Sequence, residues 1–116
     1  MHDIITKQDI DFLVDTFYQQ VMQDELLSSF FENIHFEEHK PSMVHFWCFV
    51  LLNEPGYKTN VTEKHLHMQL EARHFERWIH YFNETIDAHF SGEKAEMAKQ
   101  RAAIIGWTIQ QKLAKK

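Results

Sequence analysis

Three histidines, His65, His67 and His74, fall within one short segment of the chain. Neutral imidazole is the commonest metal ligand among side chains, although histidine is also an ordinary surface residue. His65 and His67 are two positions apart, so on a helix they point to opposite sides and cannot share a metal. The chain has a single cysteine, which excludes a thiolate zinc site.

Two Glu-x-x-His pairs, Glu32–His35 and Glu71–His74, have the spacing found in di-iron carboxylate bundles. Such bundles need both pairs in the middle of helices that face a common interior. Here Glu32 falls near the end of one predicted short helix and Glu71 near the start of another. With 17 acidic residues and nine histidines, pairs at this spacing are expected by chance. A di-iron bundle is therefore kept only as a minor alternative.

A haem site requires fewer specific residues than a di-iron site, because one neutral imidazole on one face of the iron is enough within an apolar sheath. The chain is rich in aromatic residues, with ten phenylalanines, three tryptophans and three tyrosines. Such residues either fill a core or line a pocket for a large flat ligand. There is no Cys-x-x-Cys-His motif, so a porphyrin would be held without a covalent bond. Composition alone leaves open both a haem protein and a non-haem helical interaction module.

Helices must position these residues, because three glycines and two prolines are too few turn formers for a many-stranded β fold. Apolar residues at steps of three and four predict a first helix that includes 10–21 and is capped by Thr6 and Asp9. A second helix is predicted over 37–53. We expect Pro41 in its first turn, where a missing N–H is tolerated.

Residues 53–60 are predicted to form a loop, and the histidine segment after it a short helix. A long helix then carries an apolar stripe over 75–90, Gly92 breaks the chain after it, and a last helix covers 95–113. The chain is thus predicted to be all-α, and its length suits a single domain over residues 1–116.

The charge and hydropathy of the chain exclude several classes of partner. The net charge is −5 and no run of basic residues is present, so we expect no binding to nucleic acid. The longest apolar run, residues 46–52, is too short to span a membrane, and the N-terminus lacks a signal-peptide pattern. The single cysteine, Cys48, fits a reducing compartment. We therefore expect a soluble cytoplasmic protein.

Five blocks of the sequence carry a resemblance to a known family. They are LVDTFYQQV (13–21), FEEHKPSMVHFW (36–47), LLNEPGYKTNVTEKHL (51–66), HFERWIHYFNETID (74–87) and FSGEKAEMAKQRAAII (90–105). In this order, over nearly the whole chain, they resemble the group III truncated haemoglobins. The resemblance implies a globin-like domain folded as a two-over-two helical sandwich around haem b. His74, which opens the fourth block, is expected to cap or pack against the helix that follows.

The resemblance also assigns expected roles to individual residues. His65 matches the proximal histidine, the metal ligand that bonds the haem iron. Tyr18 matches the distal tyrosine, and Trp78 matches a tryptophan that lines the distal pocket. His39 matches the residue at the distal entrance, and Met43 an apolar wall of the cavity. Aromatic positions around the porphyrin are matched by Phe17, Phe31, Phe46 and Trp47.

These roles imply a protein that binds small gaseous ligands such as O2, CO and NO, or peroxide. Dioxygen on ferrous haem carries partial negative charge, so hydrogen-bond donors in a dry pocket hold it tightly. Tyr18 and Trp78 would supply such donors. Tight retention suits sensing or chemistry, such as oxidation of NO to nitrate or peroxidase-like cleavage of peroxide. The chain has no flavin or nicotinamide motif, so either reaction would need a separate electron-donor protein.

Overall fold

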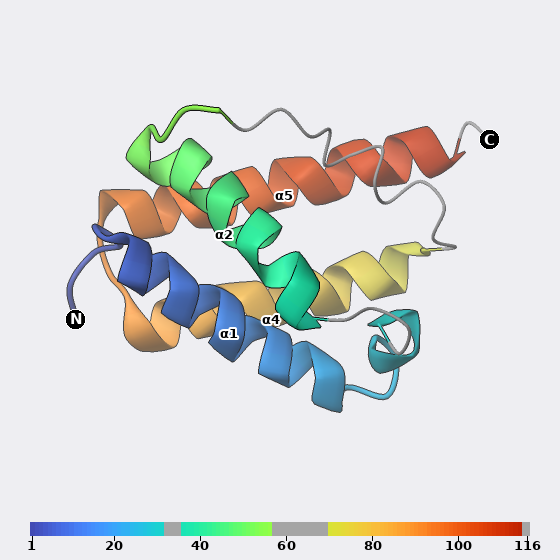
Figure 1. Cartoon of the computed structure of the whole chain (residues 1–116). Helices are drawn as coiled ribbons and strands as arrows, with labels where there is room; N and C mark the ends of the chain where they lie inside the picture. The colour runs from blue at the N-terminus through green and yellow to red at the C-terminus, as the bar shows by residue number, and fades with distance from the viewer. Residues whose placement is uncertain (32–35, 57–69, 115–116) are drawn as a thin grey trace.

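The computed structural model describes residues 1–31, 36–56 and 70–114, which form four α-helices and one short 3-10 helix (Figure 1). Their bounds are α1 (Lys7–Gln23), η1 (Ser28–Phe31), α2 (Phe36–Leu52), α4 (Ala72–His89) and α5 (Glu93–Ala114). No strand occurs among these residues, and no helix among them has the length and hydropathy needed to cross a membrane.

The helices form two layers (Figure 1). α1 and α2 pack against each other in one layer, and α4 and α5 pack side by side in the other. Between the layers, α1 contacts α4 and α2 contacts α5. This arrangement confirms the all-α prediction and the two-over-two sandwich implied by the resemblance.

The start of α1 agrees with the sequence pattern. The Asp9 backbone N–H donates to Thr6 Oγ1 at 3.1 Å, and the Thr6 N–H donates to Asp9 Oδ2 at 3.1 Å. This reciprocal pair satisfies two backbone donors that the first turn of a helix leaves unpaired. The predicted cap of the first helix is therefore confirmed.

Pro41 does not lie where the sequence analysis placed it. α2 begins at Phe36, so Pro41 falls in the second turn and not in the first. Proline has no N–H to donate to the carbonyl four residues earlier, that of Glu37. Glu37 and Pro41 are both exposed, so water can bond to that carbonyl in place of the helix. The helix can therefore start earlier than the proline alone suggests.

The segment before α1 closes one end of the sandwich by binding the start of α5. Both carboxylate oxygens of Asp3 accept hydrogen bonds there, from the backbone N–H groups of Lys94 and Ala95, each at 2.8 Å. Ile4 beside it is completely buried in the core. Gly92, just before α5, has a φ of +141°, and it lies in the break between α4, which ends at His89 with Phe90 as its C-cap, and α5. We call Asp3, Ile4, Gly92, Lys94 and Ala95 the closed end.

Candidate functional site

Aromatic side chains from α1, α2 and α4 meet around Phe82. The rings of Trp47 and Trp78 both stack on Phe82, with centroid distances of 5.1 Å and 5.9 Å and interplanar angles of 24° and 14°. The Phe17 ring forms T-shaped pairs with Phe82 and with Trp78, with centroid distances of 5.3 Å and 5.9 Å. Phe46 lies against Trp47 at 5.0 Å. Four of the aromatic residues singled out in the sequence are thus brought into one cluster.

Phe82, at the centre of this cluster, was predicted only as part of the apolar stripe of the long helix. It lies four residues after Trp78, and residues at that spacing are neighbours on a helix surface. That spacing was the signal that would have placed Phe82 beside the candidate site. It is almost fully buried and belongs to the core, so its part in the cluster is to support the other rings.

Four side chains of the cluster region lie at the margin of the core. Phe17, Met43, Phe46 and Trp78 are only partly buried, although all four pack against buried core residues. We call these four residues the aromatic edge. Apolar surface of this kind is suited to be covered by a flat apolar ligand.

Tyr18 follows Phe17 on α1 and is buried, with 6% of its surface exposed. Burial disfavours the charged phenolate and raises the pKa of Tyr18 to about 12. The hydroxyl group therefore keeps its proton throughout the physiological range. A neutral phenol can donate a hydrogen bond as well as accept one.

The other candidate residues are not among the members of this cluster, or they fall outside the described part of the chain. His39 is exposed on the first turns of α2. Phe31 ends η1, and the orientation of its side chain is not described. His65, the expected metal ligand, lies outside the described residues, as does the predicted short helix around it.

His74 is buried, and its side chain caps the N-terminal end of α4. Its Nδ1 atom accepts the backbone N–H of Glu71 at 2.8 Å, and its ring presents an edge contact to Phe30 at 4.7 Å. The expectation that His74 caps the following helix is confirmed. In the described part of the chain, no three histidine, cysteine or acidic side chains lie close enough together to hold a metal ion. The Glu71–His74 pair thus gives no support to a di-iron site.

The described residues of this region fit a haem. A porphyrin is flat and largely apolar, and the aromatic edge offers partly exposed apolar side chains from three helices. Tyr18, the residue after Phe17 on α1, adds a neutral phenol that can donate a hydrogen bond.

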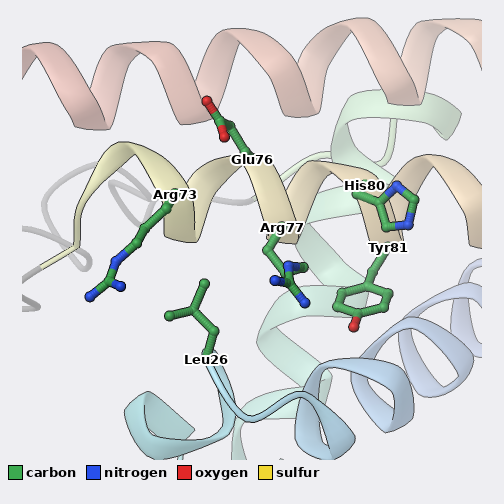
Figure 2. Close-up of a pocket in the computed structure, with 6 residues that line it drawn as sticks. All are labelled: Leu26, Arg73, Glu76, Arg77, His80 and Tyr81. Carbon is green, nitrogen blue, oxygen red and sulfur yellow. The ribbon is translucent and has the colours of Figure 1, made fainter.

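A separate hollow of about 530 Å³ lies along the first half of α4 (Figure 2). It is lined by Leu26, Arg73, Glu76, Arg77, His80 and Tyr81. Arg73, Arg77 and Tyr81 extend from α4 toward the turn that carries Leu26, whereas Glu76 points away from it (Figure 2). Nothing in the sequence pattern had singled out this hollow.

Comparison with known proteins agrees with the geometry. Residues 2–109 match the family model of the bacterial-like globins. The group 3 truncated hemoglobin ctb of Campylobacter jejuni is 29% identical over 120 residues, which cover 97% of this chain and 94% of that protein. The crystal structure of group III truncated hemoglobin from Campylobacter jejuni aligns with a TM-score of 0.85 at 29% identity, covering 97% of this chain and 95% of that one.

These matches confirm the resemblance to the group III truncated haemoglobins that the sequence blocks carried. A family model that spans nearly the whole chain also fixes the general activity, since globins bind small ligands through a haem. The chain belongs to the bacterial-like globin family.

Proposed function

We propose that this chain binds haem b with His65 as the iron ligand, and that Tyr18 and Trp78 would retain bound dioxygen by donating hydrogen bonds to it. The observation that carries the distal part is the burial of Tyr18, whose neutral phenol is only 6% exposed. Phe17, the residue before Tyr18, contacts Trp78 with a ring-centroid distance of 5.9 Å, so α1 and α4 lie close together at this level.

Haem supplies an iron atom to which a diatomic ligand can bind, and the side chains decide which ligand is held. The indole N–H of Trp78 can only donate, and a neutral Tyr18 can donate as well. A ligand with partial negative charge, such as dioxygen, gains from both donors in a region with little water. Carbon monoxide is less polar and gains less. The pair therefore favours dioxygen over carbon monoxide.

The remaining positions complete the proposed site. We assign Met43, Phe46 and Trp47 to its apolar walls, with Phe17 on the α1 side, because these residues belong to the apolar core or pack against it. His39, exposed on α2, is assigned to the distal entrance. Firm retention of oxygen suits reaction with a second small molecule, such as nitric oxide, better than transport. Such a reaction would take electrons from a separate donor protein.

Haem binding is tested first. The protein is purified and its absorption spectrum is compared with that of a His65→Ala variant. We expect a Soret band in the wild type and its loss or shift in the variant, since imidazole is the proposed ligand of the iron. A colourless but stably folded wild type would instead favour the non-haem helical module.

The distal donors are tested by oxygen dissociation in the wild type, Tyr18→Phe and Trp78→Leu. A hydrogen bond to a charged group contributes about 1.5–3 kcal/mol, so each variant should release oxygen roughly one to two decades faster. Carbon monoxide dissociation from the same proteins serves as the internal control and should change much less. Equal oxygen dissociation rates in all three proteins would eliminate the proposed mechanism.

A further inference from the structure

Asp24 lies at the C-terminal end of α1, and its carboxylate is buried, with 2% of the side chain exposed. Oδ1 accepts the backbone N–H groups of Leu26 at 2.7 Å and Leu27 at 3.1 Å. Oδ2 accepts a hydrogen bond from Arg77 Nη1 at 2.8 Å and from the Tyr81 hydroxyl at 2.5 Å. One buried carboxylate thus joins the turn after α1 to α4.

Asp24 stays ionised although it is buried. Burial alone would raise its pKa, but the hydrogen bonds from Tyr81, Leu26 and Leu27 and the charge of Arg77 together lower the pKa below its usual range. Hydrogen bonds to a charged acceptor are stronger and more sensitive to direction than apolar contacts. This group is therefore a directional link between the two helices.

The link spans the two helices that carry the proposed oxygen donors. Tyr18 lies on α1, six residues before Asp24, and Trp78 lies on α4 between the two residues that bind Asp24. Stacking of Trp78 on Phe82 orients the ring, but apolar contacts are not directional, so they limit sliding of α4 along α1 less sharply than hydrogen bonds do. The carboxylate restricts that sliding.

We propose that Asp24, Arg77 and Tyr81 are positioning residues that fix the placement of the Trp78 indole relative to the Tyr18 phenol, so that both can reach one ligand. This inference rests on the proposed function, since it concerns how its two donors are aligned. The energy of a hydrogen bond falls steeply as its angle departs from linear. A small shift of α4 would thus weaken the bond from Trp78 while that from Tyr18 remains.

Tyr81→Phe is the sharpest variant. It removes the hydroxyl that binds Asp24, keeps the ring, and leaves Arg77 to balance the buried charge, so the fold should be retained. Lys99→Met is the matched control. Lys99 joins α4 to α5 through Asp87 at 2.7 Å, so this variant also removes a polar link of α4, one that does not reach α1.

The first measurement follows Trp78 itself and needs no haem. The chain has three tryptophans, so labelling with 5-fluorotryptophan gives three fluorine resonances, and that of Trp78 is assigned by its loss in Trp78→Leu. We expect the Trp78 resonance to move or broaden in Tyr81→Phe and to stay in place in Lys99→Met.

The second measurement is oxygen dissociation in the purified, haem-loaded proteins. Partial loss of one hydrogen bond should make release about three- to tenfold faster in Tyr81→Phe, with Lys99→Met within about twofold of the wild type. The stretching frequency of bound carbon monoxide should shift toward that of a less polar pocket in Tyr81→Phe alone. Lower stability by itself would produce neither change.

Support requires both the moved Trp78 resonance and the faster release. Either result without the other overturns the inference, and so do equal effects in Lys99→Met. Unchanged release in Tyr81→Phe, combined with faster release in Tyr18→Phe, would leave the proposed function standing and reject the positioning role. A colourless wild type would reject the proposed function and with it the role in ligand retention, whatever the fluorine spectrum shows.

Discussion

At the closed end, Ile4 is completely buried and Ala95 is 1% exposed, whereas the four side chains of the aromatic edge are all partly exposed. Ile4 and Ala95 belong to the apolar core, and the four side chains of the aromatic edge pack against that same core. At the closed end the chain itself completes the packing, with the N-terminal segment laid across the start of α5. At the aromatic edge, the described chain leaves large apolar side chains incompletely covered.

On the proposed function, this difference separates residues that stabilise the fold from residues that contact the ligand. Fully buried groups contribute to folding through every atom removed from water, and partly exposed ones through only some. Substitutions at the closed end should therefore act on the free energy of unfolding. Substitutions at the aromatic edge should act mainly on ligand binding. A variant of the aromatic edge that lowers the free energy of unfolding more than a variant of the closed end would contradict this comparison.

The largest effect is expected for Ile4→Ala compared with Met43→Ala. Truncation of a fully buried isoleucine costs about 2–5 kcal/mol, because it removes apolar contacts and leaves a cavity. Met43 is only partly buried, so its truncation should cost well under half as much. Urea unfolding of the two variants without haem measures both values. An equal loss in the two variants would show that the aromatic edge is packed as firmly as the closed end.

The sequence predicted local features of this fold well. The Thr6–Asp9 cap and the capping role of His74 involve partners three residues apart, so their geometry follows from helix formation alone. The apolar stripe of α4 was likewise visible as a period, and it placed Trp78 on the inner face. The family resemblance, and not the period, assigned that residue to a distal pocket.

Features that depend on distant partners could not be predicted. Asp24 is separated from its partners Arg77 and Tyr81 by 53 and 57 residues, and Asp3 from Ala95 by 92. A carboxylate at either position is an ordinary surface residue in the sequence, because its burial is decided by how the helices pack. The wrong placement of Pro41 has a similar cause. Where a helix starts depends on whether nearby carbonyls can reach water.

A smaller effect, with a defined pH dependence, is expected for Asp3→Ala. Loss of a side chain that accepts backbone N–H groups at a helix start costs about 0.5–2 kcal/mol, so the free energy of unfolding at pH 7 should fall by about that amount. Burial would raise the pKa of Asp3, but hydrogen bonds from the N–H groups of Lys94, Ile4 and Ala95 and the charge of Lys94 bring it below the ordinary value of 3.8.

Because this pKa is lowered on folding, the unfolded chain takes up the proton first as the pH falls. The stabilisation from Asp3 is therefore fully present above pH 3.8 and is lost as the pH falls through the lower folded value. Urea unfolding at pH 7 and pH 3 should show a smaller acid loss in Asp3→Ala than in the wild type. Part of the loss should persist, because the pKa values of Asp9 and Asp24 are lowered too. An identical acid loss in both proteins would mean that folding does not lower the pKa of Asp3.

The smallest effect is a gain in stability from Gly106→Ala. Gly106 lies on α5 beside Trp78 of the aromatic edge. A Cβ atom there would lie 3.6 Å from Phe75 Cδ1 and 4.0 Å from Trp78 Cζ3, which are ordinary contact distances. Alanine in a helix interior is favoured over glycine by roughly 0.5–1 kcal/mol, so the free energy of unfolding should rise by up to that amount. Urea unfolding measures the gain.

Gly92→Ala at the closed end is the matched contrast, and it should have the opposite sign. Its φ of +141° disfavours any side chain, and a Cβ atom would lie 2.6 Å from Asp3 Cγ. A residue forced into such a backbone conformation costs of the order of 1–3 kcal/mol, and the displaced carboxylate would also lose its hydrogen bonds to the start of α5.

Oxygen dissociation gives a second measurement on Gly106→Ala. Since the new methyl group only touches Trp78, the dissociation rate should stay within about twofold of the wild type, well short of the effect of losing a hydrogen bond. If Gly106→Ala lowers stability or speeds oxygen release, α5 must lie closer to Trp78 than these distances indicate. The aromatic edge would then have no space for an added methyl group on the α5 side.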